Sequence, residues 1–413
     1  MRGAMEVIES RFKETEIGLI PKDWEVERLE NVMEGFTPNK KLKQSDYKAI
    51  GKFPVIDQGQ EYVAGFYDDE TMVFDKDLPV ILFGDHTRII KYVDFPFICG
   101  ADGLKIIIPK ENFHRKYFYY ALLNLNIPSR GYNRHFKILK EKLIPLPPLE
   151  EQKAIADILS TVQNAIEKTE KVINATKQLK KSIMKHLFTY GAVAVDEIEK
   201  VKLKESEIGL IPEHWEVVKL GEVFKITQKP KNLKLENYNL IPFIPMENIG
   251  FGTFNPKYVM KNPKDILSGT YFEKGDLLLA KITPSFENGK QSVVNDIPIE
   301  FGIATTEVIP LKQTEKSLIS YLFYYLMKPE FRKYLALKME GSTGRKRLPK
   351  EVLFNSLIPL PPLDEQQKIA NILTTIDQKI QAEEKKKTVL QNLFKTLLQQ
   401  LMTGKIRVKK TKT

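Results

Sequence analysis

Four short polar segments carry the side chains with the most specific binding chemistry in this sequence of 413 residues. Arginine can form paired hydrogen bonds with the edge of guanine and asparagine with that of adenine, whereas lysine and serine mostly hold phosphates. The segments therefore predict DNA contacts, and the alternative for each is an ordinary solvated loop. The candidate contact residues are His86, Thr87, Arg88, Arg130, Asn133, Arg134, Lys281, Thr283, Asn288, Lys290, Arg345, Lys346 and Arg347.

The four segments lie between predicted strands and helices. Residues 84–88 and 281–291 each follow a predicted strand. Residues 129–135 are basic and include a tyrosine, and residues 341–347 form the most basic loop of the chain.

Motifs that would support catalysis are absent from the sequence. There is no GxxxxGKS/T phosphate loop and no (D/N/S)PP(Y/F/W) segment to present a base for methyl transfer. The GxG at 250–252 does not continue into a cofactor-binding strand, loop and helix, and the five histidines and one cysteine lack metal-ligand spacing. Cys99 lies in an apolar run and is predicted to be a buried structural thiol. We therefore expect a non-catalytic chain without a cofactor or metal of its own.

Charge and composition favour a polyanionic partner inside the cell. Lys and Arg number 64 against 53 Asp and Glu, which gives a formal net charge of +11. One cysteine allows no internal disulfide, no apolar stretch approaches the ~20 residues of a membrane span, and the first residues lack a signal-peptide core. We expect a soluble cytoplasmic protein. The basic tail from Lys405 to Lys412 is expected to be a disordered end rather than a segment that recognises DNA bases.

The chain contains an internal repeat that frames dissimilar segments. Residues 14–29 and 205–220 are identical at 11 of 16 positions, and residues 143–159 and 357–373 at 13 of 17. Between these framing sequences the similarity largely disappears, and the second enclosed segment is 23 residues longer than the first. Two globular domains on one plan, with different recognition surfaces, are the simplest interpretation.

The enclosed segments, 30–142 and 221–356, show a mixed α+β pattern. Strands are expected at 54–56, 72–74, 80–83, 88–93, 104–108, 241–244, 276–282, 291–294 and 307–311. Helices are expected at 112–125, 315–327, 329–339 and 349–356.

Each PLPPL sequence is followed by a pattern typical of a long amphipathic helix. Apolar residues recur every seven positions, without internal glycine or proline. The preceding prolines and the acidic residues after them suit helix starts, and Gly191 and Gly404 suit helix ends. We expect the two helices to pack together along rows that include Ile155, Val162, Val172, Leu179, Ile369, Ile372, Ile376 and Leu393. The alternative is that each helix packs on its own domain.

Chain geometry favours an antiparallel helix pair. About 15 residues join the end of the first helix near Tyr190 to the second frame near Glu205, and they span at most ~50 Å. A helix of about 40 residues is ~60 Å long, so a parallel pair would place the second domain out of reach. We expect an antiparallel pair with one domain near each end, related by a pseudo-twofold axis.

The framing motifs resemble those of the specificity subunit of type I restriction–modification enzymes. EIGLIPxxWEVxxL and IPLPPLxEQxxIAxIL each occur twice, in the order domain, helix, domain, helix, over nearly the whole chain. The residues that carry the second motif are Leu146, Pro147, Pro148, Glu151, Gln152, Leu360, Pro361, Pro362, Glu365 and Gln366. The resemblance implies two target-recognition domains joined by two long helices. Together with the patterns above, we expect an α+β fold, with two mixed α/β target-recognition domains joined by two long antiparallel coiled-coil helices as a pseudo-twofold symmetric internal repeat.

The resemblance also implies a function and partners. The chain would assemble with two methyltransferase subunits and with restriction subunits. Because the expected antiparallel helix pair carries two domains of dissimilar content, we expect these domains to read a bipartite, asymmetric target in double-stranded DNA. S-adenosylmethionine, ATP and Mg²⁺ would act on those partners, with methylation at adenine N6. Base-reading residues do not transfer, because recognition segments vary within the family.

The expected organisation assigns every part of the chain. The parts are a target-recognition domain at 1–148, a long helix at 149–190, a linker at 191–204, a second domain at 205–362, a second helix at 363–404 and the basic tail at 405–413.

Two other classes of protein remain as alternatives. The first is a non-catalytic coiled-coil adaptor that holds two protein-binding modules. The second is a fused methyltransferase and nuclease, which the missing catalytic segments disfavour. A steep dependence of duplex binding on salt would distinguish the DNA-binding protein from the adaptor.

Overall fold

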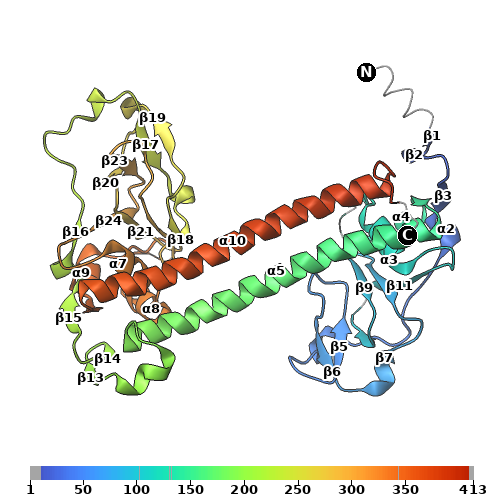
Figure 1. Cartoon of the computed structure of the whole chain (residues 1–413), viewed down its shortest axis with the longest axis horizontal. Helices are drawn as coiled ribbons and strands as arrows, with labels where there is room; N and C mark the ends of the chain where they lie inside the picture. The colour runs from blue at the N-terminus through green and yellow to red at the C-terminus, as the bar shows by residue number, and fades with distance from the viewer. Residues whose placement is uncertain (1–10, 102, 130, 132, 343, 409–413) are drawn as a thin grey trace, which may run out of the picture. The chain divides into compact units, whose positions relative to one another are not determined.

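The computed structural model describes residues 11–101, 103–129, 131, 133–342 and 344–408. The chain forms two compact units (Figure 1). Unit 1 comprises Met1–Lys171 and Glu384–Thr413, and unit 2 comprises Val172–Glu383. Each unit joins a β-rich body to parts of two long helices, α5 (Leu149–Tyr190) and α10 (Leu363–Met402). The predicted α+β fold with two long helices is confirmed.

Unit 1 contains two four-stranded sheets and two strand pairs. The sheets have the strand orders β6-β5-β10-β7 and β4-β11-β8-β9, and the pairs are β1-β2 and β12-β3. The strands are β1 (Phe12–Thr15), β2 (Gly18–Pro21), β3 (Glu25–Arg28), β4 (Met33–Phe36), β5 (Phe53–Ile56), β6 (Gly65–Tyr67), β7 (Val73–Phe74), β8 (Val80–Gly84), β9 (Ile90–Val93), β10 (Phe97–Cys99), β11 (Leu104–Pro109) and β12 (Leu143–Leu146). The helices are α2 (Leu29–Val32), α3 (Arg115–Leu123) and α4 (Phe136–Lys140), with short 3₁₀ turns at Gln44–Asp46 and Glu70–Met72.

Unit 2 repeats this plan with additions. Its sheets have the orders β16-β24-β21-β22-β18 and β19-β17-β23-β20, and its pairs are β13-β14 and β15-β25. The strands are β13 (Leu203–Ser206), β14 (Gly209–Pro212), β15 (Glu216–Lys219), β16 (Phe224–Ile226), β17 (Ile241–Ile244), β18 (Phe251–Phe254), β19 (Val259–Lys261), β20 (Thr270–Glu273), β21 (Leu277–Ala280), β22 (Gln291–Val293), β23 (Phe301–Ala304), β24 (Val308–Gln313) and β25 (Leu357–Leu360). The helices are α6 (Leu220–Val223), α7 (Ile319–Tyr325), α8 (Pro329–Leu337) and α9 (Lys350–Asn355). Short 3₁₀ turns lie at Val195–Lys200, Leu235–Asn237, Met246–Asn248 and Pro263–Asp265.

The framing sequences of each repeat meet at the start of a long helix. In unit 1, β3 pairs with β12, and the indole Nε1 of Trp24 donates to Glu151 Oε2 at 3.0 Å. In unit 2, β15 pairs with β25, and Trp215 Nε1 donates to Glu365 Oε2 at 2.9 Å. The repeated residues thus build one joint twice, between the β-rich body and the first turn of the helix.

A buried glutamine beside each of these glutamates completes the joint. Gln152 accepts the backbone N–H of His114 at 2.8 Å and donates to the carbonyl of Pro147 at 2.9 Å. Gln366 accepts the N–H of Leu318 and donates to the carbonyl of Pro361, both at 2.8 Å. Because a buried amide needs these partners, the EQ pair has a structural role in both repeats.

Within each unit the two long helices run antiparallel, as predicted. In unit 1, Glu170 near the end of its part of α5 pairs with Lys387 at 2.7 Å, while Glu151 at the start pairs with Arg407 beyond the end of α10. In unit 2, Lys180 pairs with Asp377 at 2.5 Å. The backbone N–H of Ala192, which follows α5, donates to the first-turn Glu365 at 3.3 Å.

The packing rows of the long helices differ from the prediction at several positions. Ile155 and Leu159 are fully buried, but the predicted row members Val172 and Leu179 are 41% and 54% exposed. Leu393 is also exposed, at 43%. In a straight helix, each residue is rotated about the helix axis by ~20° relative to the residue seven positions before it. Residues spaced strictly by seven therefore turn gradually away from the partner helix.

The β-rich bodies contain strands that the sequence did not predict, among them the fully buried β10 and β23. Each predicted strand overlaps an observed one, although the strand expected from residue 88 begins at Ile90 because Arg88 has a φ of 63°. The helix expected at 315–327 begins at Ile319. Cys99 is buried, as predicted, and burial raises the pKa of its thiol to about 12.

Arg407 of the C-terminal tail is held by unit 1, which corrects the expectation of a disordered end for the described part of the tail. Arg407 forms ion pairs with Glu151 and Asp23, and Gly404 packs against Pro21 and Trp24 of the first frame. Residues 409–413 lie outside the described part of the chain.

Candidate nucleic-acid interface

In unit 1 the structure brings two of the predicted reading loops together. The loop 84–88 leaves β8 and turns back sharply, with the N–H of Arg88 donating to the carbonyl of Gly84 at 2.7 Å. The buried Asp85 accepts the N–H of His135 through its carbonyl at 2.8 Å and that of Phe136 through Oδ1 at 2.7 Å. The end of the 129–135 loop is therefore fixed beside the 84–88 loop.

The candidate side chains of unit 1 have different surroundings. Arg88 Nη1 donates to the carbonyl of Ile127 at 2.9 Å, and Thr87 Oγ1 donates to the carbonyl of Gln58 at 2.7 Å, so both bind their own unit. His86 is half-buried, while Asn133 and Arg134 are exposed. Arg130 lies outside the described residues.

In unit 2 the other two predicted loops also lie together. The N–H of Thr283 donates to the carbonyl of Lys346 at 3.0 Å, and the N–H of Leu348 donates to the carbonyl of Lys281 at 2.8 Å. Each pair of loops occupies the same place in its repeat. One loop follows the corresponding strand, β8 or β21. The other precedes a short helix, α4 or α9, which leads to the framing sequence that contains PLPPL.

Some of the basic candidate side chains of unit 2 form hydrogen bonds within the unit. Arg347 holds Glu307 with two nitrogens at 2.9 and 2.7 Å, and these hydrogen bonds lower the pKa of the glutamate. Lys290 Nζ donates to the carbonyl of Met246 at 2.8 Å. Burial lowers the pKa of the half-buried Lys281.

Four candidate side chains of unit 2 are exposed, namely Asn288, Arg345, Lys346 and the Glu307-bound Arg347. Within the described residues, the structure records no ion pair for Arg345 or Lys346. Their charges are therefore available to a phosphate or a base edge.

Two residues near these loops were missed by the sequence analysis. Gln58 supports the 84–88 loop by accepting the N–H of His86 at 3.2 Å. Phe251 is 62% exposed and lies near Lys290, whose Nζ is 5.4 Å from the centre of its ring. The sequence signal for Phe251 is an aromatic residue between two glycines at 250–252.

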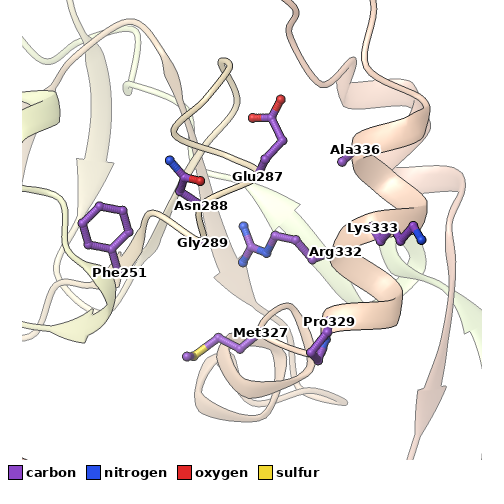
Figure 2. A pocket seen from close by; sticks show the side chains of 9 residues that line it. All are labelled: Phe251, Glu287, Asn288, Gly289, Met327, Pro329, Arg332, Lys333 and Ala336. Atoms are coloured by element: carbon purple, nitrogen blue, oxygen red, sulfur yellow. The ribbon is translucent and has the colours of Figure 1, made fainter. Parts of the chain in front are cut away.

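A hollow adjoins the 281–291 loop. It encloses about 480 Å³ and is lined by Phe251, Glu287, Asn288, Gly289, Met327, Pro329, Arg332, Lys333 and Ala336 (Figure 2). Its walls come from the loop, from the start of β18 and from α8.

The family model of the type I restriction modification DNA specificity domain matches residues 21–178 and 212–392. The chain belongs to this family. It is a DNA-recognising specificity subunit of a type I restriction–modification system, and is not one of the catalytic subunits.

Relatives and a solved structure agree with this membership. The chain is 32% identical to the type I restriction enzyme MjaVIII specificity subunit of Methanocaldococcus jannaschii, with 97% of each chain covered. It is also 32% identical to the putative MjaX specificity subunit of the same organism, covering 97% of this chain and 98% of that one. The S subunit structure from M. genitalium shares the fold with a TM-score of 0.62, at 18% identity and coverage of 92% and 96%.

No helix among the described residues is both long and apolar enough to cross a bilayer. The described residues also contain no cluster of three or more His, Cys, Asp or Glu side chains able to hold a metal ion.

Proposed function

We propose that this specificity subunit reads a bipartite, asymmetric target in double-stranded DNA, one half with each unit. The observation that carries the proposal is the equivalent placement of two loop pairs, 84–88 with 129–135 and 281–291 with 341–347, in similar frames. The loops differ in length and in residue types, so the two half-sites would differ in sequence. The formal net charge of +11 favours the phosphate contacts that position such readers.

The contact residues proposed from the sequence fall into two groups by their surroundings. Five of the exposed side chains, namely Asn133, Arg134, Asn288, Arg345 and Lys346, are proposed to touch DNA directly. The other described candidates are proposed to contact DNA after their surroundings within the unit rearrange, and they are His86, Thr87, Arg88, Lys281, Thr283, Lys290 and Arg347. Arg130 is proposed on its sequence context alone.

The proposed partners follow from the repeated frame. A partner that recognises one frame would find a second on the same chain, which supports assembly with two methyltransferase subunits. These would supply S-adenosylmethionine and transfer methyl groups to adenine N6, while restriction subunits would supply the ATP- and Mg²⁺-dependent activity. We assign target recognition to 1–148 and 205–362, the joining helices to 149–190 and 363–404, the linker to 191–204 and the tail to 405–413.

Methylome sequencing of the host tests this function. Deleting the gene for this chain should abolish methylation at one bipartite, asymmetric motif, and restoring the gene should return it. A chain with residues 30–142 replaced by those of a relative should change one half of the motif only, because β3 and β12 close the frame on either side of that segment. An unchanged methylome after deletion would reject the proposal.

A further inference from the structure

Arg332 of α8 is a buried cation that lies against the predicted reading loop 281–291. Its residue is only 7% exposed, although the loop itself and the neighbouring Lys333 reach solvent. The close view of the hollow shows its guanidinium between α8 and the backbone at Asn288 and Gly289 (Figure 2). Since arginine is rarely buried so completely, its partners indicate what the residue does.

One guanidinium joins three segments of unit 2. Arg332 Nη1 donates to the carbonyl of Phe286 in the loop at 2.9 Å, and Nη2 donates to Oε1 of Gln291, where the loop enters β22. Arg332 Nε donates to the carbonyl of Leu326 at the end of α7 at 2.9 Å. The guanidinium also lies 4.8 Å from the centre of the Phe286 ring. These contacts fix the middle and the end of the loop on the helices beneath it.

The second loop partner is itself held in place. Gln291 is fully buried, and its Nε2 donates to the carbonyl of Phe323 in α7 at 2.7 Å. Its amide therefore presents Oε1 to Arg332 in one orientation. The pair forms a continuous set of hydrogen bonds from α7 through the end of the loop to α8.

The charge of Arg332 indicates a role beyond packing. All three recorded acceptors are uncharged, and burial without a carboxylate partner is costly for an ionised group. Burial lowers the pKa of Arg332 to about 10, so the side chain stays charged at neutral pH. An apolar side chain would fill this space at a lower cost, but it could not hold three acceptors in the planar fork that a guanidinium provides.

Unit 2 has a longer loop than unit 1 at this position, together with the helix that holds it. Residues 281–290 separate β21 from β22, whereas only residues 85–89 separate β8 from β9. In unit 1, the described elements pass from α3 to α4 without a counterpart of α8. The longer loop and α8 thus occur together, and Arg332 connects them.

We propose that Arg332 is a positioning residue for DNA recognition, which holds the 281–291 loop in the conformation that presents Asn288 to the second half-site. This inference rests on the proposed function. Without this anchor, the loop would lose conformational freedom on binding, and that ordering would weaken recognition. Because Arg332 already orders the loop in the unbound protein, this loss of conformational entropy does not occur on binding.

The test measures binding of duplexes by the full chain assembled with its methyltransferase partners, using the target found by methylome sequencing. Arg332→Met should weaken binding of the matched duplex at least tenfold and reduce discrimination against substitutions in the second half-site. Discrimination in the first half-site should stay the same. Lys338→Met removes an exposed charge from the C-terminal end of the same helix and is the matched control.

Further variants separate positioning from a general loss of folded protein. Arg332→Lys keeps the charge but cannot bond all three acceptors, so it should not restore discrimination. Gln291→Ala removes one anchor and should act in the same direction if Arg332→Met fails to fold. In an Asn288→Ala background, Arg332→Met should add little to the loss of second-half discrimination, because both changes affect the same loop.

The outcomes distinguish the two proposals. Full discrimination by folded Arg332→Met or Gln291→Ala variants, with Asn288→Ala impaired, would overturn the positioning role alone. An unimpaired Asn288→Ala variant in a sequence-specific complex would also overturn it, since the loop would not present Asn288 to the target. Absence of sequence-specific binding by the unmodified complex would overturn the proposed function itself.

Discussion

Arg407 and Glu151 lie 256 residues apart in the chain and form an ion pair in which Arg407 Nε is 2.8 Å from Glu151 Oε1. The same glutamate accepts the indole N–H of Trp24, and Arg407 also holds Asp23 with two nitrogens at 2.9 and 2.7 Å. The segment after α10 thereby closes the joint of unit 1. In unit 2, Glu365 accepts the N–H of Ala192 and the indole of Trp215.

Arg407→Met should destabilise the specificity subunit by about 2 kcal/mol, because it leaves the buried Glu151 with fewer partners and removes charge-assisted hydrogen bonds. Chemical denaturation of the two proteins would measure this difference. Lys405→Met removes a charge from an exposed position of the same segment and should change stability by less than about 0.5 kcal/mol. Equal stability of the Arg407 and Lys405 variants would show that the tail only rests on the surface.

Leu401→Ala should destabilise the protein by about 2 to 5 kcal/mol, because Leu401 is fully buried where the end of α10 packs in unit 1. Leu393 on the same helix is 43% exposed, so Leu393→Ala should cost less than about 1 kcal/mol. Thermal melting compares the two variants. Similar losses would mean that the helix contact follows the heptad row expected from the sequence rather than the face observed.

The sequence predicted the long helices well because their signals are local and repeated. The prolines before them, the acidic first turns and the glycines after them are all short-range features, and Gly191 and Gly404 do have the left-handed φ values of 84° and 65°. The contact face was harder to predict. Whether Val172 or Ile173 is buried depends on the helix phase against its partner, which the apolar spacing alone does not determine.

The candidate site was predictable as loops but not as individual contacts. Residue types identified the loops 84–88 and 341–347, yet Arg88 and Arg347 both bind acceptors of their own unit. An exposed and an internally bonded arginine look alike in a sequence. Arg332 was missed for the opposite reason, since a lone arginine in an amphipathic helix is normally a solvated side chain.

Arg345→Ala should weaken recognition of the second half-site, because this exposed guanidinium lies in the most basic loop of the chain. Loss of a bidentate contact to a base would cost about 1 to 3 kcal/mol and relax one position of the target, whereas loss of a phosphate contact would weaken all duplexes alike. Titration of matched and substituted duplexes distinguishes the two cases.

Arg347→Ala is the comparison variant in the same loop. It removes the ion pair with Glu307, so its effect should depend less on the DNA sequence than that of Arg345→Ala. Binding by the Arg345 variant that equals the unmodified protein on every duplex would remove Arg345 from the reading surface.

Asp276→Asn should flatten the dependence of stability on pH between about 4 and 6. Asp276 is 2% exposed, and burial raises its pKa from 3.8 to about 6. The folded protein then binds more protons than the unfolded chain in this range, so the carboxyl makes stability fall as pH rises. The variant keeps an oxygen that can accept the N–H of Glu273 without becoming charged.

The size of this effect follows from the shift in the pKa of Asp276. A shift of about two pH units corresponds to a gain of up to about 3 kcal/mol for the variant at pH 7, relative to the same comparison at pH 4. Denaturation curves at several pH values provide the measurement. An equal pH dependence of the two proteins would contradict the assigned pKa.

The length of the gap between the half-sites should matter more than its sequence. The proposed function joins the two target-recognition domains through the long helices rather than through a flexible linker, so it predicts one preferred gap length. A helix of 42 residues is ~63 Å long at 1.5 Å per residue, and ~18 base pairs of duplex have a similar length.

Inserting or deleting one base pair in the gap should therefore reduce specific binding sharply. Each base pair moves one half-site by about 3.4 Å and rotates it by about 35° relative to the other, at roughly 10 to 10.5 pairs per turn. Substituting the gap bases without changing their number should have little effect, because the proposed contact residues bind the two half-sites and not the gap. Competition binding with a series of duplexes compares both changes directly. A target that tolerates any gap length, or that has no gap, would contradict recognition by two units joined through continuous helices.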